Sequence, residues 1–413
     1  MLVGSGRCEL IFPEDFFPAE GFTAQAHPLY VRALMIGATR PFVLVSIEMT
    51  SLPDGEAERL RLIAATSAGT KPEQVWVTVT HTFSAPHILP DDALWDEAAR
   101  QRNCRLRTLL ADAVHTATLH ARNSARDVDI TLREGQSAVP ASRDIELPDG
   151  WWVGCGGDGP ANRKLTLLQF GAEPPVALLI HMNVQPSVLD GTGAADGKCV
   201  SGDIAGILCS YFERRFPGAV CLFMVGAAGD QAPIQRAKGL AKNVDGAWAD
   251  VDLHEAGVPL AERLGVALIE EARALMMSGP GEAIAGETRL SHGSVKVPAK
   301  KMNRNLRELK PTRSCKWEPD GEVEQAYSIL RLGSLAIAGV RPELTIETDA
   351  AIKEASPFPH TLVATLVNGS AKYMAARSVY DRCMYEAINS PFMPGAAETL
   401  AEAIIGELKG AFQ

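Results

Sequence analysis

Apolar and polar positions along this chain follow two periods in turn, one typical of strands and the other of helices. Short runs rich in Val, Leu and Ile, bounded by Gly, Pro or polar residues, predict strands. The predicted strands cover residues 42–47, 75–80, 164–170, 176–181, 219–225, 327–332, 335–340 and 362–367. Several of these runs are apolar at every position, which indicates strands that are covered on both faces.

Other segments have apolar residues at spacings of three and four, the period of an amphipathic helix. These segments are residues 57–66, 95–121, 260–277 and 394–408, and further helices are expected after Gly202 and over residues 375–387. Strands and helices therefore intermingle along the chain. This order predicts an α/β fold, with a layered mixed β-sheet core that is flanked by helices.

Two stretches, residues 137–162 and 300–321, are rich in Pro and Gly or in charge, and both are expected to be long loops. The glycines of the first stretch do not open a helix after a strand, as a phosphate-binding loop would require. The chain shows neither an internal repeat nor a low-complexity linker. Residues 1–413 are therefore expected to form a single domain.

Composition narrows the class of protein. The chain has 40 Lys and Arg against 50 Asp and Glu, a net charge of −10, and 46% hydrophobic residues. This balance gives no electrostatic footprint for nucleic acid. The sequence contains neither a membrane-span window nor a signal-peptide pattern, so we expect a cytoplasmic protein without integral membrane association. The eight cysteines include no Cys-x-x-Cys pair and are expected to be free thiols.

Polar residues stand just after several of the predicted strands. His81 ends one apolar run, and His181, Asp230 and Glu343 follow three others. Ligand crevices in α/β sheets lie beyond strand ends, so these loops are candidates to converge. Two histidines, a glutamate and nearby tyrosines could bind zinc or a similar ion, although none has the short spacing of a metalloprotease helix. A structural hydrogen-bonding role for each histidine stays open.

Taken in chain order, these loops resemble the neutral/alkaline (non-lysosomal) ceramidase family. The similar segments are residues 80–86 for the THTHSGP motif, 185–187 with 201–203 for HP(T/V) and (S/N)xD, 226–233 for GxxGDxSP, 341–345 for PGExxT, and Tyr373, Tyr380, Tyr385 and Glu386 for a tyrosine-rich helix. The resemblance covers the family's catalytic domain, without its C-terminal immunoglobulin-like domain or secretion signal. It therefore implies a cytoplasmic relative with a different substrate.

The resemblance also implies a catalytic zinc that is bound by two histidines, a glutamate and a tyrosine. His81 matches the first histidine ligand, Glu343 the glutamate and Tyr373 the tyrosine. Arg143 matches an arginine that lies beside the substrate in the family. Tyr385 matches a second active-site tyrosine.

Three positions depart from the family pattern. Phe83 replaces the second histidine of its first motif, Gln185 replaces the second histidine ligand, and Ala232 replaces a serine proposed to attack the amide. Glutamine is a poor zinc ligand, so His181 or His87 would have to supply a nitrogen in its place. In an extended strand His181 and Gln185 lie about 13 Å apart, so this substitution requires the loop to bend.

The implied activity is zinc-assisted hydrolysis of an amide or ester bond in a small polar molecule other than ceramide. Of the two bonds, the C–N bond of an amide is the first expectation. Zinc-bound water would attack the carbonyl, with Asp230 or Tyr385 handling the proton. A lyase or isomerase that uses Arg143, Glu343 and the tyrosines is the alternative, and a binding protein with an inactive site is another. A homo-oligomer stays open.

Structural roles for the same residues stay open as well. Glu343 could form a salt bridge with Arg341 or another basic neighbour, and Asp230 could cap the helix that follows its Gly-rich turn. If residues 373–385 form one helix, Tyr373 and Tyr380 share a face and Tyr385 is rotated away from them. At least one tyrosine is then expected to lie in the core.

Overall fold

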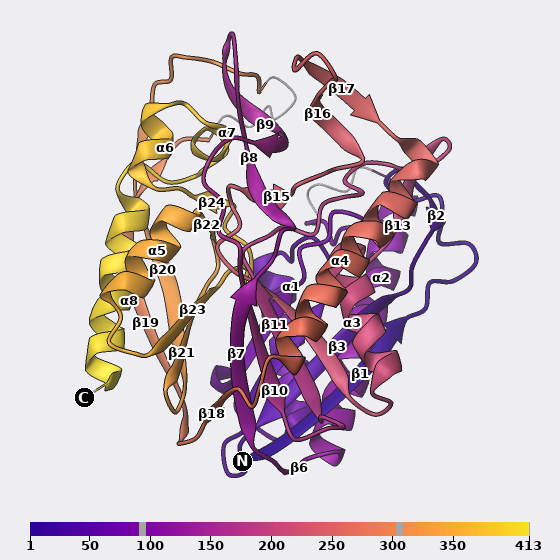
Figure 1. Ribbon diagram of the computed structural model, residues 1–413, viewed down its shortest axis with the longest axis vertical. Helices are drawn as coiled ribbons and strands as arrows, with labels where there is room; N and C mark the ends of the chain where they lie inside the picture. Colours follow the sequence, from indigo (N-terminus) through magenta and orange to yellow (C-terminus); the bar gives the residue numbers. More distant parts are fainter. Residues whose placement is uncertain (91–95, 303–308, 413) are drawn as a thin grey trace.

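Two β-sheets lie face to face between two layers of helices in the computed structural model, which describes residues 1–90, 96–302 and 309–412 (Figure 1). In the first sheet, Val45 and Val77 pack against helices α1 and α2, whereas Leu44 and Trp76 face the second sheet. Side chains alternate between the two faces of a strand, so one apolar run serves both cores. The strand order is β5-β4-β3-β1-β6, and the bounds are Val75–Val79 (β5), Phe42–Ile47 (β4), Leu29–Ile36 (β3), Leu2–Leu10 (β1), Arg126–Asp127 (β6), Asp54–Ala68 (α1) and Glu97–Asn123 (α2).

The second sheet has the same arrangement on the other side. Ile180 and Phe223 pack against helices α3 and α4, and Leu179 and Leu222 face the first sheet. The strand order is β14-β11-β10-β7-β18, and the bounds are Val220–Val225 (β14), Ala177–Met182 (β11), Lys164–Phe170 (β10), Ile130–Gln136 (β7), Glu282–Ile284 (β18), Asp203–Arg215 (α3) and Gly257–Met277 (α4).

A third sheet joins the core between the first two. Ile337 and Leu362 belong to the same apolar cluster as Trp76, and Ala338 and Val363 face helices α5 and α8. The strand order is β19-β20-β21-β23, and the bounds are Thr288–Lys300 (β19), Pro319–Leu332 (β20), Leu335–Val340 (β21), His360–Ala364 (β23), Ile346–Ala355 (α5) and Ala396–Phe412 (α8).

Short elements gather mainly at one end of the molecule, the upper end in Figure 1. They include the β8–β9 hairpin, the β16–β17 hairpin and the parallel pair of β22 with β24. The bounds are Pro140–Leu147 (β8), Gly150–Gly157 (β9), Gln231–Pro233 (β15), Lys238–Lys242 (β16), Trp248–Asp252 (β17), Glu343–Leu344 (β22), Tyr373–Met374 (β24), Arg377–Asp381 (α6) and Tyr385–Ile388 (α7). The remaining short elements are Phe22–Gln25 (β2), Gly193–Ala194 (β12), Gly197–Val200 (β13), Pro72–Gln74 (η1) and His254–Ala256 (η3).

The predicted α/β fold of layered mixed sheets and flanking helices is confirmed. Two predictions are wrong: residues 137–162 contain the β8–β9 hairpin, and residues 375–387 break into α6 and α7. Trp95 of the predicted helix and residues 303–308 of the predicted loop lie outside the described residues. Among the described helices, none is long and apolar enough to cross a membrane.

Candidate functional site

The candidate site lies beyond the carboxyl ends of parallel strand pairs. Strands β4 and β5, β11 and β14, and β21 and β23 run parallel, so the loops after them leave in the same direction within each pair. His81 follows β5, and Gln185 and Asp230 follow β11 and β14. Glu343 and Tyr373 follow β21 and β23 and are paired with each other in the short β22–β24 ladder.

His81 is held in a strained backbone conformation. Its φ of 62° lies in the left-handed region, which costs a residue other than glycine about 1–3 kcal/mol. The ring Nδ1 faces the carbonyl oxygen of Thr50, and Nε2 lies 3.0 Å from Oε2 of Glu343. Burial disfavours the charged imidazole, but the Glu343 carboxylate more than offsets this and raises the pKa of His81. Because both partners are acceptors, His81 is assigned as an imidazolium that donates to each.

Glu343 is the acceptor at the centre of this group. Besides His81, its Oε2 accepts a hydrogen bond of 2.7 Å from Nε2 of Gln185. Burial would raise the pKa of Glu343, but the charge of His81 and the hydrogen bonds lower it below its ordinary value. Arg341 pairs with Asp54, so the basic neighbour of Glu343 is His81 and not Arg341. Glu343 is thus a carboxylate held by site residues.

Arg143, on β8, connects His81, Glu343 and Gln185 on one side with Tyr373, Tyr385 and Glu386 on the other. These seven residues are the cluster around Arg143. Its Nε and Nη2 donate to Oε1 of Glu386 at 3.0 and 2.6 Å, and its Nη1 donates to Oε1 of Gln185 at 2.9 Å. Its guanidinium carbon lies 5.0 Å from the ring centre of Tyr373 and 5.5 Å from that of Tyr385. The sequence comparison included Glu386 only as part of the tyrosine pattern, and its role as the anchor of Arg143 was not predicted.

The tyrosines pair differently from the predicted helix. Tyr373 and Tyr385 meet edge to face, with ring centres 5.9 Å apart. Tyr380 instead lies in the core, where its hydroxyl donates to the carbonyl of Phe392. The expectation that Tyr373 and Tyr380 share a face is wrong because the chain leaves a strand and breaks before each short helix. Trp152, from the β8–β9 hairpin, packs against Tyr385 with ring centres 5.5 Å apart.

Asp230 caps a helix, although not the one expected from its Gly-rich turn. Its Oδ1 accepts from the backbone N–H of Ile346, the first residue of α5, and its carbonyl accepts from the N–H of Arg143. Burial, together with the charge of Glu386, raises the pKa of Asp230 to about 7. Burial and the same charge raise the pKa of Asp144 well above its ordinary value. Asp230 is only partly buried and can exchange protons near neutral pH.

The other two histidines have partners elsewhere. His181 is buried inside β11, and its Nε2 faces the carbonyl of Val363 at 2.8 Å. Burial lowers the pKa of His181 to about 4, so it is neutral. The ring of His87 bonds Glu20 at 2.7 Å. Gln185 therefore contacts Glu343 with no replacement nitrogen from either histidine.

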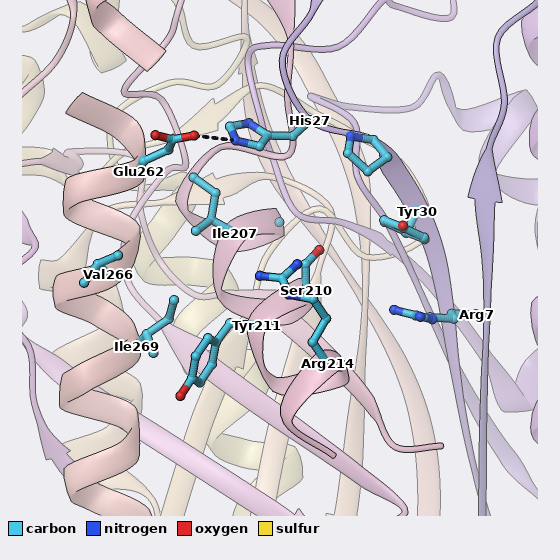
Figure 2. A pocket seen from close by; sticks show the side chains of 12 residues that line it. Arg7, His27, Tyr30, Ile207, Ser210, Tyr211, Arg214, Glu262, Val266 and Ile269 are labelled. Atoms are coloured by element: carbon cyan, nitrogen blue, oxygen red, sulfur yellow. Dashed lines mark hydrogen bonds and ion pairs between the residues drawn. The ribbon is translucent and has the colours of Figure 1, made fainter. Parts of the chain in front are cut away.

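Two cavities differ in their position relative to the cluster around Arg143. One, of about 530 Å³, lies between strands β1 and β3 and helices α3 and α4, and none of its lining residues belongs to the cluster around Arg143 (Figure 2). The other, of about 830 Å³, is lined by residues that include Arg341 and Lys372. Lys372 donates to Asn389, whose amide donates to the hydroxyl of Tyr385. The second cavity thus connects to the cluster through one amide side chain.

Comparison with known proteins identifies the fold. No protein-family model and no curated protein matches the chain. Two solved structures match all of it: a ceramidase complexed with C2, at 14% identity and a TM-score of 0.76 over 75% of that chain, and a neutral ceramidase from Pseudomonas aeruginosa, at 16% identity and a TM-score of 0.75 over 74% of that chain. The chain has the neutral ceramidase fold. The predicted resemblance is confirmed at the level of the fold.

Within this neutral ceramidase fold, the residues at the implied zinc position do not fit the metal. The N–H groups of Arg143 hold Oε1 of Gln185, so the amide NH₂, which has no lone pair for a metal, faces Glu343. Both ring nitrogens of His81 face acceptors, and His181 lies elsewhere. Over the described parts of the chain, no group of three or more His, Cys, Asp and Glu side chains could hold a metal ion.

Proposed function

We propose that the chain is a hydrolase that cleaves an amide or ester bond in a small polar molecule at the cluster around Arg143. The observation that carries this proposal is the convergence of His81, Glu343, Tyr373 and Tyr385 on Arg143 and its partner Gln185. The fold shared with ceramidases supports the reaction class. The zinc of the sequence-based hypothesis is not retained, because Gln185 and His81 present N–H groups at its position.

The chemistry follows from the protonation of the cluster. Asp230, with its pKa of about 7, takes a proton from a water molecule while the water oxygen bonds to the substrate carbonyl carbon. The carbonyl oxygen becomes negative and is stabilised by the positive charge of the Arg143 guanidinium and by the hydroxyl of Tyr385, which burial keeps protonated. When the C–N or C–O bond breaks, Asp230 returns the proton to the leaving nitrogen or oxygen.

The second cavity supports a polar, anionic substrate. Its lining holds four cations, Lys300, Lys301, Arg341 and Lys372, beside three carboxylates, Asp54, Asp320 and Glu324. Arg341 is paired with Asp54, and Lys372 links the cavity to Tyr385 through Asn389. Cationic side chains of this kind bind carboxylate or phosphate groups. An acyl compound whose anionic group lies in this cavity would place its carbonyl toward Tyr385 and Arg143.

A cytoplasmic location belongs to the same proposal. All eight cysteines are free, and four of them are buried. Thiols stay reduced in the cytoplasm, whereas secreted proteins commonly pair them. A small polar metabolite is a substrate that such a compartment supplies.

A lyase or isomerase is the second candidate, because the imidazolium of His81 beside the carboxylate of Glu343 is an acid paired with a base. Such a pair could move a proton next to a carbonyl and eliminate or shift a group without water. The two candidates differ in whether an oxygen from water enters the product. Mass spectrometry of products formed in isotopically labelled water therefore distinguishes them.

The test is turnover of a panel of amides and esters of small carboxylic and phosphorylated acids, in chelator-treated buffer. We expect at least one compound to be hydrolysed with incorporation of labelled oxygen. Arg143→Lys keeps the charge but loses the planar fork, so turnover should fall by at least about 100-fold. The matched control, Arg105→Lys, alters only a surface pair with Asp15 and should keep full activity. Equal activity in both variants would contradict the assignment of the site, and products without labelled oxygen would favour the second candidate.

A further inference from the structure

The amide group of Gln185 has one possible orientation in this site. Arg143 is fixed by its two bonds to Glu386, and a guanidinium has only donors to offer. The amide oxygen of Gln185 must therefore face Arg143, and its NH₂ must face the carboxylate of Glu343. Turning the amide over would place NH₂ against N–H and oxygen against carboxylate, so both hydrogen bonds would be lost.

The same orientation determines what the position beside Glu343 can bind. Gln185 and His81 both point N–H groups at Oε2 of Glu343, and both side chains are buried. A divalent metal needs lone pairs at the positions that these hydrogens occupy. Hydrogen bonds here connect the same side chains that a metal would otherwise connect.

We propose that Gln185, oriented by Arg143, excludes divalent metal ions from this site. Hydrogen bonds from Gln185 and His81 to Glu343 then connect the side chains in place of a metal ion. The inference does not depend on the reaction class, since it concerns only what the site binds. Glutamine and histidine both fit a buried loop position, but only histidine carries a ring nitrogen that can ligate. A single replacement, Gln185→His, should therefore produce a zinc site with His81, Glu343 and Tyr373.

The test compares the zinc content of the intact chain and its variants after expression with added zinc and dialysis, measured by elemental analysis. We expect less than stoichiometric zinc in the unaltered chain and about one zinc ion per chain in Gln185→His. Gln235→His is the matched control, because it adds a histidine at an exposed glutamine and should bind no stoichiometric zinc. The double variant Gln185→His with His81→Ala should lose the metal again.

For the unaltered chain, cobalt provides a readout that does not depend on the folding of any variant. Titration of the unaltered chain with Co²⁺ should give no visible ligand-field bands of a tetrahedral site, and Gln185→His should give them. Stoichiometric zinc in the unaltered chain that disappears in His81→Ala would overturn the proposal. A folded Gln185→His variant that binds neither ion would also overturn it, because Gln185 would then not be the residue that excludes the metal.

Discussion

A single guanidinium group, that of Arg143, orients both sides of the candidate site. It fixes the amide of Gln185 on one side and lies over the rings of Tyr373 and Tyr385 on the other. Glu386 compensates its charge in the interior. A buried pair of this kind is disrupted strongly when one partner is removed, because the other charge stays buried without compensation. The position of Arg143 is therefore a condition for the arrangement of the whole cluster.

The pKa of Asp230 predicts how activity depends on pH. Its carboxyl must be ionised to act as the base, so turnover should rise with pH through about 7 and level off above it. Asp230→Asn removes the base but retains an oxygen for the N–H of Ile346, and turnover should fall by about 100-fold or more. A pH profile of the unaltered chain and the turnover of the variant check both expectations. An unaltered profile in the variant would assign the titration to another group.

The same shift has a consequence for stability. Because the pKa of Asp230 is raised in the folded state, its contribution is present below the unfolded pKa near 4 and is lost as pH rises through about 7. The unaltered chain therefore loses stability between pH 4 and pH 8, and Asp230→Asn does not. The free energy of unfolding of the variant minus that of the unaltered chain should increase by about 1–3 kcal/mol over this range. Urea denaturation at the two pH values measures the difference. A constant difference would show that Asp230 is not the group that titrates.

The sequence predicted candidate residues for the site but not how they bond. His81 and Glu343 follow apolar strand runs, which are local features, and the family resemblance added Tyr373 and Arg143. The bond from Arg143 to Glu386 joins residues 243 positions apart and depends on how the hairpin meets α7. Long-range contacts of this kind have no periodic signal, so neither this anchor nor the amide orientation it imposes could be predicted.

At the scale of elements, glycine explains why the β8–β9 hairpin and strand β1 are absent from the sequence-based prediction. Strand β9 has glycines that weaken a strand pattern, yet a Cβ at Gly154 would lie 2.6 Å from the side chain of Ile145 on β8. Strand β1 was not predicted, and a Cβ at its Gly4 would lie 1.9 Å from the carbonyl oxygen of Ala121 in α2. These glycines allow close approach between elements. The long apolar runs, such as β5 and β11, were predicted because their own residues determine their burial.

Another close approach, between Gly339 and Trp76, joins the third sheet to the first. A Cβ at Gly339 would lie 2.7 Å from the indole ring, which is fully buried, so Gly339→Ala should lower the free energy of unfolding by about 1–3 kcal/mol. Gly406 is exposed in α8, and a Cβ there would meet nothing within 4 Å. Gly406→Ala should raise the free energy of unfolding by about 0.5–1 kcal/mol. Chemical denaturation measures the free energy of unfolding of both variants. Equal changes in this free energy would contradict close packing of Gly339 against Trp76.

At the scale of the whole molecule, one apolar cluster contains residues from all three sheets that form the core. Trp76 comes from the first sheet, Leu222 from the second and Ile337 from the third. His81, Gln185 and Glu343 of the candidate site come from loops of the same three sheets, and Arg143 comes from β8. Elements that share one core lose their contacts together, so the three sheets should unfold as one unit.

The predicted single domain over residues 1–413 can therefore be tested by its cooperativity. Scanning calorimetry should show one transition, with a calorimetric enthalpy close to the van't Hoff enthalpy. Gly339→Ala provides the sharper measurement, because a weakened junction in a cooperative core should move the whole transition to lower temperature without splitting it. If the third sheet were a separate domain, the variant would instead release a second, earlier transition. Near-ultraviolet circular dichroism of Trp76 and the other tryptophans should follow the same midpoint as the far-ultraviolet signal of the backbone, since one core holds both.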